Sequence, residues 1–172
     1  MLPVVLIRPA IPGDAPAIAR VHVETWQTAY RGQVPEAYLA SLDIGRRTAI
    51  WTEIFRENKS ITFVAEIENK VIGFCSLMPS RDEDANKKAI GEIAALYVSP
   101  RHWRRGAGRR LGERALAEAR NHGWAIVTLW VLQTNTPAQV FYEQLGFVLD
   151  GVKKMLELDG HDLPEVRYRR ML

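Results

Sequence analysis

The sequence is poor in cysteine: Cys75 is the only one in 172 residues, and it lies in an apolar stretch. A single thiol excludes a fold held together by disulfides within the chain and fits a reducing compartment. No run of about 18 apolar residues occurs, so no membrane-spanning helix is expected. The N-terminal stretch MLPVVLIRP has neither a basic segment nor a long apolar run, so no secretory signal is expected. These absences predict a cytoplasmic protein without a membrane partner.

The sequence also lacks the pattern of a metal site. Its four histidines, His22, His102, His122 and His161, show no ligand spacing, so no metal is expected. A covalent mechanism through Cys75 would need a partner that activates the thiol, and none is evident. We therefore expect Cys75 to be a buried strand residue.

What the sequence does contain is an ordinary globular composition, with 47% hydrophobic and 25% charged residues. This composition argues against disorder, and the length predicts one domain over residues 1–172. The formal net charge is only +3. The positive charge is concentrated in one short stretch that contains five arginines: Arg101, Arg104, Arg105, Arg109 and Arg110. Such a concentration indicates an anionic ligand at one loop.

Hydrophobic periodicity predicts helices and strands in alternation, without an internal repeat. Helices are expected at 14–30, 35–41, 45–57, 107–121 and 136–145, and strands at 4–7, 61–67, 71–77, 90–98, 125–132, 147–158 and 166–171. Asp14 is an expected N-cap, and Thr136 opens an expected capping box with proline at the first helical position. The charged, aperiodic segment 79–88 is expected to be an exposed loop. The chain therefore has a mixed α and β pattern.

The stretch 92–111, EIAALYVSPRHWRRGAGRRL, has the most informative pattern. It predicts a strand, a basic turn, the step Gly106-Ala107-Gly108 and the start of a helix. Backbone N–H groups and the positive end of a helix dipole meet at such a turn, which favours phosphate binding. A P-loop sequence is absent, and Gly112 lies one residue too far along for a dinucleotide-binding fingerprint. Both of these nucleotide-binding alternatives are excluded.

A second motif follows, in which Asn135 precedes Ala138 and the run FYEQLGF at 141–147. With the Gly-x-Gly turn, in this order and spacing, the chain resembles the GNAT superfamily of acetyl-CoA-dependent N-acetyltransferases over most of its length. One position departs from the family pattern, because Trp103 stands where Arg or Gln is usual. The resemblance implies an α/β (α+β) single-domain fold with a central mixed, mostly antiparallel, six- to seven-stranded sheet flanked by about four helices.

The resemblance also implies acetyl-CoA as cosubstrate and a set of residues that bind it. The turn would bind the pyrophosphate mainly through its backbone N–H groups, so the replacement of the usual Arg or Gln side chain by Trp103 need not prevent binding. The splayed strand before the turn would hold the pantetheine and the acetyl carbonyl, and the motif asparagine would bind a pantetheine amide. By resemblance these cofactor-binding positions are Leu96, Tyr97, Val98, Arg104, Arg105, Gly106, Ala107, Gly108, Arg109 and Asn135.

Acetyl transfer to an amine requires loss of an ammonium proton and protonation of the departing thiolate. Tyr142 is the candidate acid, because a phenol is protonated at neutral pH and the family has a tyrosine at this position. Glu92 is the candidate base, since a carboxylate in an apolar strand needs a polar cleft or a partner. Deprotonation through ordered water is the alternative. Glu24, Trp26 and Tyr30 could form an acidic and aromatic wall for a cationic amine.

Several functions stay open at this stage. A non-catalytic acyl-CoA sensor with the same fold is the main alternative to an N-acetyltransferase acting on a primary amine. Nucleic-acid binding through the arginine-rich turn would require a broader basic face, which the sequence lacks, so no nucleic-acid partner is expected. The identity of the amine is open, because substrate specificity depends on loops outside the motifs. A homodimer is possible by resemblance.

Overall fold

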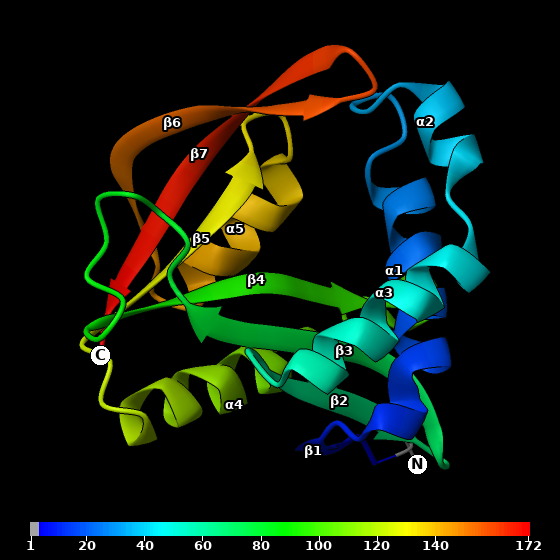
Figure 1. Cartoon of the computed structure of the whole chain (residues 1–172), viewed down its shortest axis with the longest axis horizontal. Coiled ribbons are helices and arrows are strands. Elements are labelled where there is room, and N and C mark those ends of the chain that lie inside the picture. The colour runs from blue at the N-terminus through cyan, green and yellow to red at the C-terminus, as the bar shows by residue number, and fades with distance from the viewer. Residues whose placement is uncertain (1–3) are drawn as a thin grey trace.

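The computed structural model describes residues 4–172 (Figure 1). The helices are α1 (Ala15–Ala29), α2 (Glu36–Ser41), α3 (Ile44–Glu57), α4 (Ala107–Asn121) and α5 (Thr136–Gln144), with short 3₁₀ turns η1 (Pro12–Asp14) and η2 (Pro100–His102). The strands are β1 (Leu6–Pro9), β2 (Ile61–Ile67), β3 (Lys70–Pro79), β4 (Ile90–Val98), β5 (Ile126–Leu132), β6 (Val148–Leu158) and β7 (His161–Met171). No helix within 4–172 is long and apolar enough to cross a membrane.

The seven strands form one sheet in the order β1-β2-β3-β4-β5-β7-β6. Only β4 and β5 are parallel neighbours in this sheet, and every other neighbouring pair is antiparallel. The expected mixed, mostly antiparallel sheet is therefore confirmed with seven strands. Over the described part of the chain it is flanked by five α-helices where about four were expected.

Helices cover both faces of the sheet, and the alternation of side chains along the strands assigns residues to each face. Phe63 and Cys75 pack with the residues of α4 and α5 in the larger core cluster. Val64 and Phe74, one residue away in each strand, pack with α1 and α3 in a second cluster. Cys75 is fully buried, as expected, and burial raises the pKa of its thiol to about 12.

Two helix N-termini differ from the sequence expectation. The Asp14 carboxylate forms no cap hydrogen bond with α1, and instead accepts hydrogen bonds from the Arg8 guanidinium and the Ile11 N–H. Asn135, not Thr136, is the N-cap of α5, and its side chain accepts a hydrogen bond from the Ala138 N–H at 3.3 Å. At Asp14 the charged Arg8 donor engages the expected capping carboxylate, and at α5 the better placed acceptor is Asn135.

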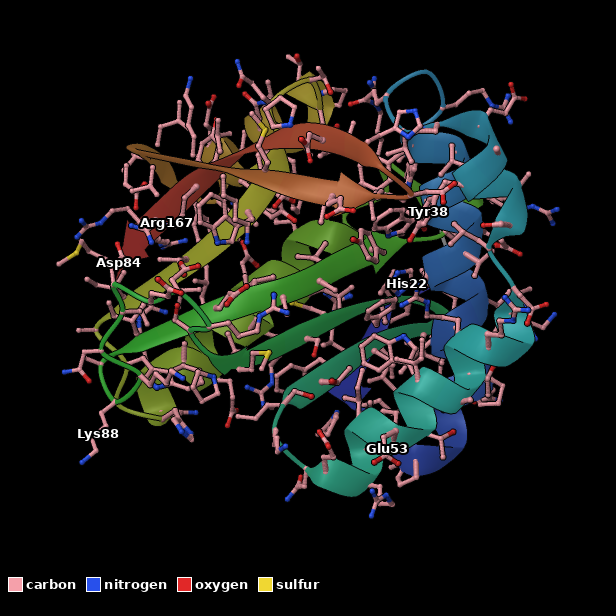
Figure 2. All side chains as sticks on the ribbon, turned by 45° about the horizontal axis from the view of Figure 1, so that its top comes forward. His22, Tyr38, Glu53, Asp84, Lys88 and Arg167 are labelled. Atoms are coloured by element: carbon pink, nitrogen blue, oxygen red, sulfur yellow. The ribbon has the colours of Figure 1, made fainter. Side chains whose placement is uncertain are left out.

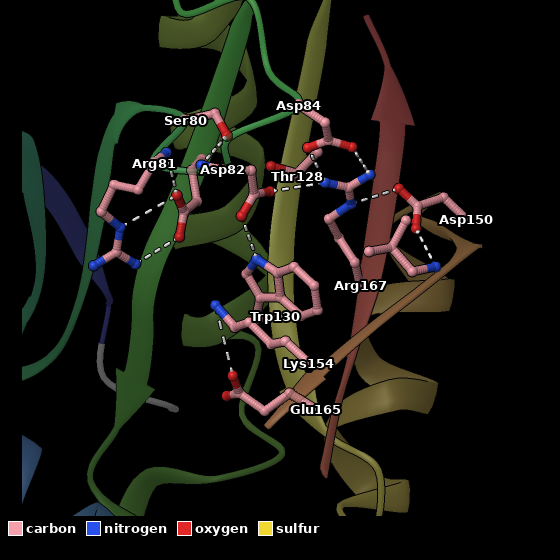
Figure 3. A network of polar contacts seen from close by, with 12 residues as sticks. Ser80, Arg81, Asp82, Asp84, Thr128, Trp130, Asp150, Lys154, Glu165 and Arg167 are labelled. Atoms are coloured by element: carbon pink, nitrogen blue, oxygen red, sulfur yellow. Dashed lines mark hydrogen bonds and ion pairs between the residues drawn. The ribbon is translucent and has the colours of Figure 1, made fainter. Parts of the chain in front are cut away.

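The segment 79–88 is only partly the exposed loop that its charge suggested. Figure 3 shows the reason: the Arg167 guanidinium of β7 donates to the carboxylates of Asp82 and Asp84 at 2.7–3.0 Å. Asp82 also accepts a hydrogen bond from the Trp130 indole at 2.9 Å. These contacts between residues far apart in sequence fix the loop against β5 and β7.

Strand β7 also begins at His161 instead of Val166, since its first residues pair with β6.

Candidate active site

The sheet contains a wedge between its parallel neighbours, β4 and β5. The two strands pair only over Ile90–Glu92 and Ile126–Thr128. Strand β4 nevertheless continues to Val98 and β5 to Leu132, with no further pairing between them among the described residues. Open strand edges present backbone N–H and C=O groups to an extended ligand. The wedge is therefore a place where such a ligand could enter the sheet.

The direction of the backbone groups in β4 can be followed from its end. The Ser99 N–H donates to a β3 carbonyl, that of Ile72, at 2.7 Å. Along a strand, the backbone groups of successive residues point alternately to the two edges. Tyr97, two residues before Ser99, therefore also faces β3, whereas the backbone groups of Leu96 and Val98 face the wedge. The backbone groups of the three expected residues are thus divided between two edges of the strand.

Trp103 has a structural role at the mouth of the wedge. Its indole N–H donates to the Val98 carbonyl at 2.6 Å, and the same carbonyl accepts the Thr25 hydroxyl at 3.1 Å. These two donors occupy the Val98 carbonyl and leave its N–H for a ligand. The indole therefore connects the basic turn to the end of β4, a role that the sequence pattern did not indicate.

The turn before α4 exposes free backbone donors. Arg104 and Gly106 have left-handed backbone conformations, with φ of 57° and 85°. Helix α4 has no side-chain cap, and within residues 4–172 nothing accepts a hydrogen bond from the N–H groups of Ala107, Gly108 or Arg109. Unpaired N–H groups at the positive end of a helix dipole fit a phosphate or pyrophosphate group.

The glycine at position 108 allows the close approach of two elements. A Cβ atom added to Gly108 would lie 3.4 Å from ring carbons of Phe141 in α5 and 3.7 Å from Val98. At Gly106 the surrounding space is open, but the positive φ is unfavourable for other residues. The first glycine therefore provides the backbone conformation of the turn, and the second provides space beside α5.

The arginines of the turn differ in their environments. Arg104 and Arg105 are exposed and form no ion pair with another described residue, so their charges face solvent. Arg109 is also exposed and forms an i,i+4 ion pair with Glu113 at 2.8 Å. Arg110 donates to the Val5 carbonyl at the edge of the sheet. Of these four arginines, Arg104 and Arg105 combine exposure with freedom from a partner among the described residues, and Arg101 before the turn does so as well.

Tyr142 lies on α5 and is 8% exposed. Its ring packs against Phe141 and Phe147, and its hydroxyl forms no hydrogen bond with another described residue. Burial, followed by the nearby Tyr97 and Cys75, raises the pKa of Tyr142. The phenol is consequently protonated throughout the neutral range and can act as a proton donor.

Glu92 is buried at the point where β4 and β5 separate. Its carboxylate accepts hydrogen bonds from the guanidinium group of Arg81 and, at 2.9 Å, from the Arg81 backbone N–H. The Arg81 side chain is 58% exposed and Glu92 2% exposed, so the pair runs from the protein interior to the surface. The partner that a carboxylate in this strand requires is therefore Arg81.

A second carboxylate, Glu165 of β7, lies on the same face of the sheet. Figure 3 shows Glu165 beside Lys154, with an ion-pair distance of 3.7 Å. Burial raises the pKa of Glu165, while Lys154 and Arg81 lower it and Glu92 raises it further. Glu165 and Glu92 are thus electrostatic neighbours, although one lies on β7 and the other on β4.

Comparison with known proteins decides the family. The model of the acetyltransferase (GNAT) family matches residues 21–147. The chain belongs to the GNAT acetyltransferase family. It is 32% identical to the uncharacterised N-acetyltransferase YuaI of Bacillus subtilis over 81% of this chain and 78% of that protein. It is also 32% identical to an uncharacterised N-acetyltransferase of Archaeoglobus fulgidus, over 79% and 88% of the two chains.

Solved structures agree at the level of the fold. The PaiA N-acetyltransferase of Thermoplasma acidophilum, solved with coenzyme A, has a TM-score of 0.74 at 23% identity, covering 98% of this chain and 99% of that one. The ribosomal-protein-alanine N-acetyltransferase of Brucella melitensis has a TM-score of 0.76 at 23% identity, covering 97% and 99%. The expected fold and enzyme class, an acetyl-CoA-dependent acyltransferase, are therefore confirmed by the family and the fold together.

In this GNAT enzyme, the expected acceptor residues are only partly brought together. Trp26 and Tyr30 contact each other edge to face, with ring centroids 4.7 Å apart. Burial raises the pKa of Tyr97, and both Trp26 and Tyr30 lie close enough to oppose that rise. Glu24 is instead exposed on another face of α1, because residues two positions apart on a helix point in different directions. The aromatic part of the expected wall is present and its acidic part is elsewhere.

Sequence reasoning missed several residues on this face of the GNAT sheet. Arg81, Glu165 and Arg167 were not singled out, because each meets its partners only after loops and strands come together. His22 was considered only as a metal ligand, yet it packs at 5.1 Å from the Tyr97 ring. The weak signal available was the charged loop 79–88 itself, whose aperiodic charges turned out to have partners in the sheet.

Proposed function

We propose that this GNAT enzyme transfers the acetyl group of acetyl-CoA to the nitrogen of a primary amine. The observation that carries the proposal is the wedge between β4 and β5, which opens next to the unpaired N–H groups that begin α4. One feature suits an extended thioester chain and the other its pyrophosphate. Their adjacency matches one molecule that contains both groups.

The pyrophosphate would bind to the N–H groups of Ala107, Gly108 and Arg109, with Arg104 and Arg105 adding positive charge. The turn conformation at Gly106 holds these donors in place. Backbone groups of Leu96 and the N–H of Val98 would bind the pantetheine and polarise the thioester carbonyl. Asn135 caps α5 through its Oδ1 atom, which leaves the Nδ2 atom as a donor to a pantetheine amide.

Tyr97 would contribute differently from the other strand residues. Its backbone faces β3, and its side chain lies against His22 and Phe74 on the face covered by α1 and α3. The acceptor amine would reach the thioester from this face, with Trp26 and Tyr30 as part of the wall. Glu24 would then lie at the outer surface of α1.

The chemistry requires one proton acceptor and one proton donor. Glu92 would accept the ammonium proton, directly or through a water molecule, while Arg81 fixes its orientation. The amine nitrogen would attack the thioester carbonyl carbon, and the carbon–sulfur bond would break. Tyr142 would then protonate the thiolate, because its raised pKa keeps the phenol protonated.

A thiol-release assay with acetyl-CoA and a panel of primary amines tests this proposal, with mass spectrometry of the products. We expect stoichiometric release of the coenzyme A thiol and formation of an N-acetyl product with at least one class of amine. Tight acetyl-CoA binding without acetylation of any amine would instead support a non-catalytic acyl-CoA sensor.

A further inference from the structure

A group of buried polar atoms without partners lies on the face of the sheet that α1 and α3 cover. Four side-chain nitrogen atoms of the described residues are buried and form no hydrogen bond: His22 Nδ1, Trp26 Nε1, Trp51 Nε1 and His102 Nδ1. Three of these residues belong to α1 and α3, on one face of the sheet. Buried polar groups are nearly always hydrogen-bonded, so this concentration marks a side of the sheet that is more polar than a packed core requires.

Two of these atoms belong to residues that line a groove of about 320 Å³. The groove lies between α3 and strands β3 and β4, and its lining includes His22, Arg47, Trp51, Met78 and Arg81. His22 is 9% exposed and Trp51 3% exposed, and Figure 2 shows His22 between α1 and the sheet. The volume is at the small end of the range of about 300–1,000 Å³ for small-molecule pockets.

The charges around the groove favour an anion. Lys59 is paired with Glu57 at 3.3 Å, and Arg81 with Glu92. Arg47 forms no ion pair or side-chain hydrogen bond with any residue that the structure describes. Its guanidinium is therefore the one uncompensated charge lining the groove over residues 4–172.

The neighbouring groups reinforce this preference. Burial, and then the charge of Arg47, lowers the pKa of His22 to about 3, so its imidazole is neutral at physiological pH. With a neutral imidazole beside it, the Arg47 guanidinium is the charged donor of this part of the groove, and a guanidinium can bind a carboxylate through two parallel hydrogen bonds.

Two residues that line the groove also contact residues of the proposed reaction centre. Arg81 lines the groove and also binds the carboxylate of Glu92, the proposed base. The His22 ring lies 5.1 Å from the ring of Tyr97 on β4. A small molecule held in the groove would therefore have one end near Arg47 and the other near the proposed site of acetyl transfer.

We propose that the acceptor is a small, amino-acid-like molecule whose carboxylate binds to Arg47 while its primary amine faces Glu92. This inference rests on the proposed N-acetyltransferase function and narrows its substrate class. Arg47 is a specificity residue in this account, and it takes no part in the proton transfers.

The test uses matched acceptors: the standard amino acids, their carboxamides and the corresponding decarboxylated amines, each with acetyl-CoA. We expect kcat/KM for the best amino acid to exceed that of its carboxamide by about 10- to 100-fold, the range of a charge-assisted hydrogen bond. Arg47→Gln should remove most of this preference through KM, and Arg47→Lys should keep part of it. Arg46→Gln, an exposed neighbour on α3 outside the groove, should keep the preference intact.

Calorimetry of coenzyme A binding completes the test, because both Arg47 variants should bind it like the unaltered enzyme. The groove assignment would be overturned if amines were acetylated equally well with and without a carboxylate. It would also be overturned if Arg47→Gln preferred carboxylate-bearing acceptors as strongly as Arg46→Gln does. Either result would leave the transferase function standing. If no amine is acetylated although coenzyme A still binds, the proposed function itself is overturned, and the groove assignment with it.

Discussion

The cofactor turn and the acceptor face are built in contrasting ways. The turn, residues 103–109, is contiguous, largely exposed and uses backbone N–H groups. The acceptor face comprises His22, Trp26, Tyr30, Arg47, Trp51, Arg81, Glu92, Tyr97 and Glu165, and it uses side chains from helices and strands distant in sequence. In the proposed function, one region presents a fixed backbone geometry to acetyl-CoA. The other region would supply side chains that can change residue by residue to suit an acceptor.

This difference suggests that the two regions can be disturbed separately. A change in the turn should remove cosubstrate binding whatever the acceptor. A change on the acceptor face should alter the rate or the choice of amine and leave coenzyme A affinity unchanged. Four variants, each with a matched control, test that separation.

Gly108→Asp should abolish measurable coenzyme A binding, a loss of at least about 100-fold. The side chain would crowd Phe141 and bring a negative charge to the helix N-terminus that we assign to the pyrophosphate. Calorimetric titration with coenzyme A measures the effect. Ala117→Asp places the same charge on an exposed site of α4 and should bind normally. Equal affinities in the two variants would contradict the assignment of the turn.

Tyr142→Phe should reduce kcat by about 100-fold, the contribution typical of a general acid, with acetyl-CoA affinity unchanged. Single-turnover kinetics gives the rate, and Tyr168→Phe is the control, since it removes a buried hydroxyl that bonds Glu143 on α5. An acid must be protonated to act, so activity would fall as pH rises through its pKa. Because that pKa is raised, no such decline is expected below about pH 10. A normal rate in Tyr142→Phe would exclude this role.

Glu92→Gln should lower kcat by about 10- to 100-fold, less than a removed acid because water can partly replace a base. Glu165→Gln, on the same face of the sheet, is the matched comparison and should have the smaller effect on kcat. Coenzyme A affinity should be unchanged in both variants. If Glu165→Gln were the slower enzyme, the base would have to be reassigned to β7.

Arg104→Gln should weaken coenzyme A binding only two- to fivefold, because an exposed arginine contributes little beside the backbone donors. The difference should shrink further in high salt, which screens exposed charges. Arg120→Gln, in the last turn of α4, should match the unaltered enzyme. A loss as large as that of Gly108→Asp would mean that the arginine, and not the backbone, holds the anion.

The same contrast explains what could be predicted from the sequence. Strand β4 and helix α4 have the predicted bounds, because apolar periodicity, glycine and proline signals all lie within the segment itself. Position 135 was assigned to cosubstrate binding by resemblance, and its capping of α5 emerged only from the structure. Trp103 was treated only as a departure from the family pattern, and its contact with Val98 could not be read from that pattern.

The acceptor face was harder to predict because its contacts are long-range. Glu92 was identified as a carboxylate in need of a partner, but Arg81 meets it only once the loop 79–88 folds against the sheet. Glu24, Trp26 and Tyr30 are close in sequence, yet helix geometry separates the first from the other two. Arg47 and Trp51 lie one turn apart on α3 and become interpretable only when strands β3 and β4 complete the groove.

A crystal structure of the enzyme with acetyl-CoA would test the assignment of the turn and the wedge together. The pyrophosphate should accept hydrogen bonds from the N–H groups of Ala107 to Arg109. The thioester should lie in the wedge beside Leu96, with its carbonyl carbon open to the face covered by α1 and α3. A pyrophosphate bound away from this turn, or a thioester outside the wedge, would contradict the proposed acetyl-CoA site.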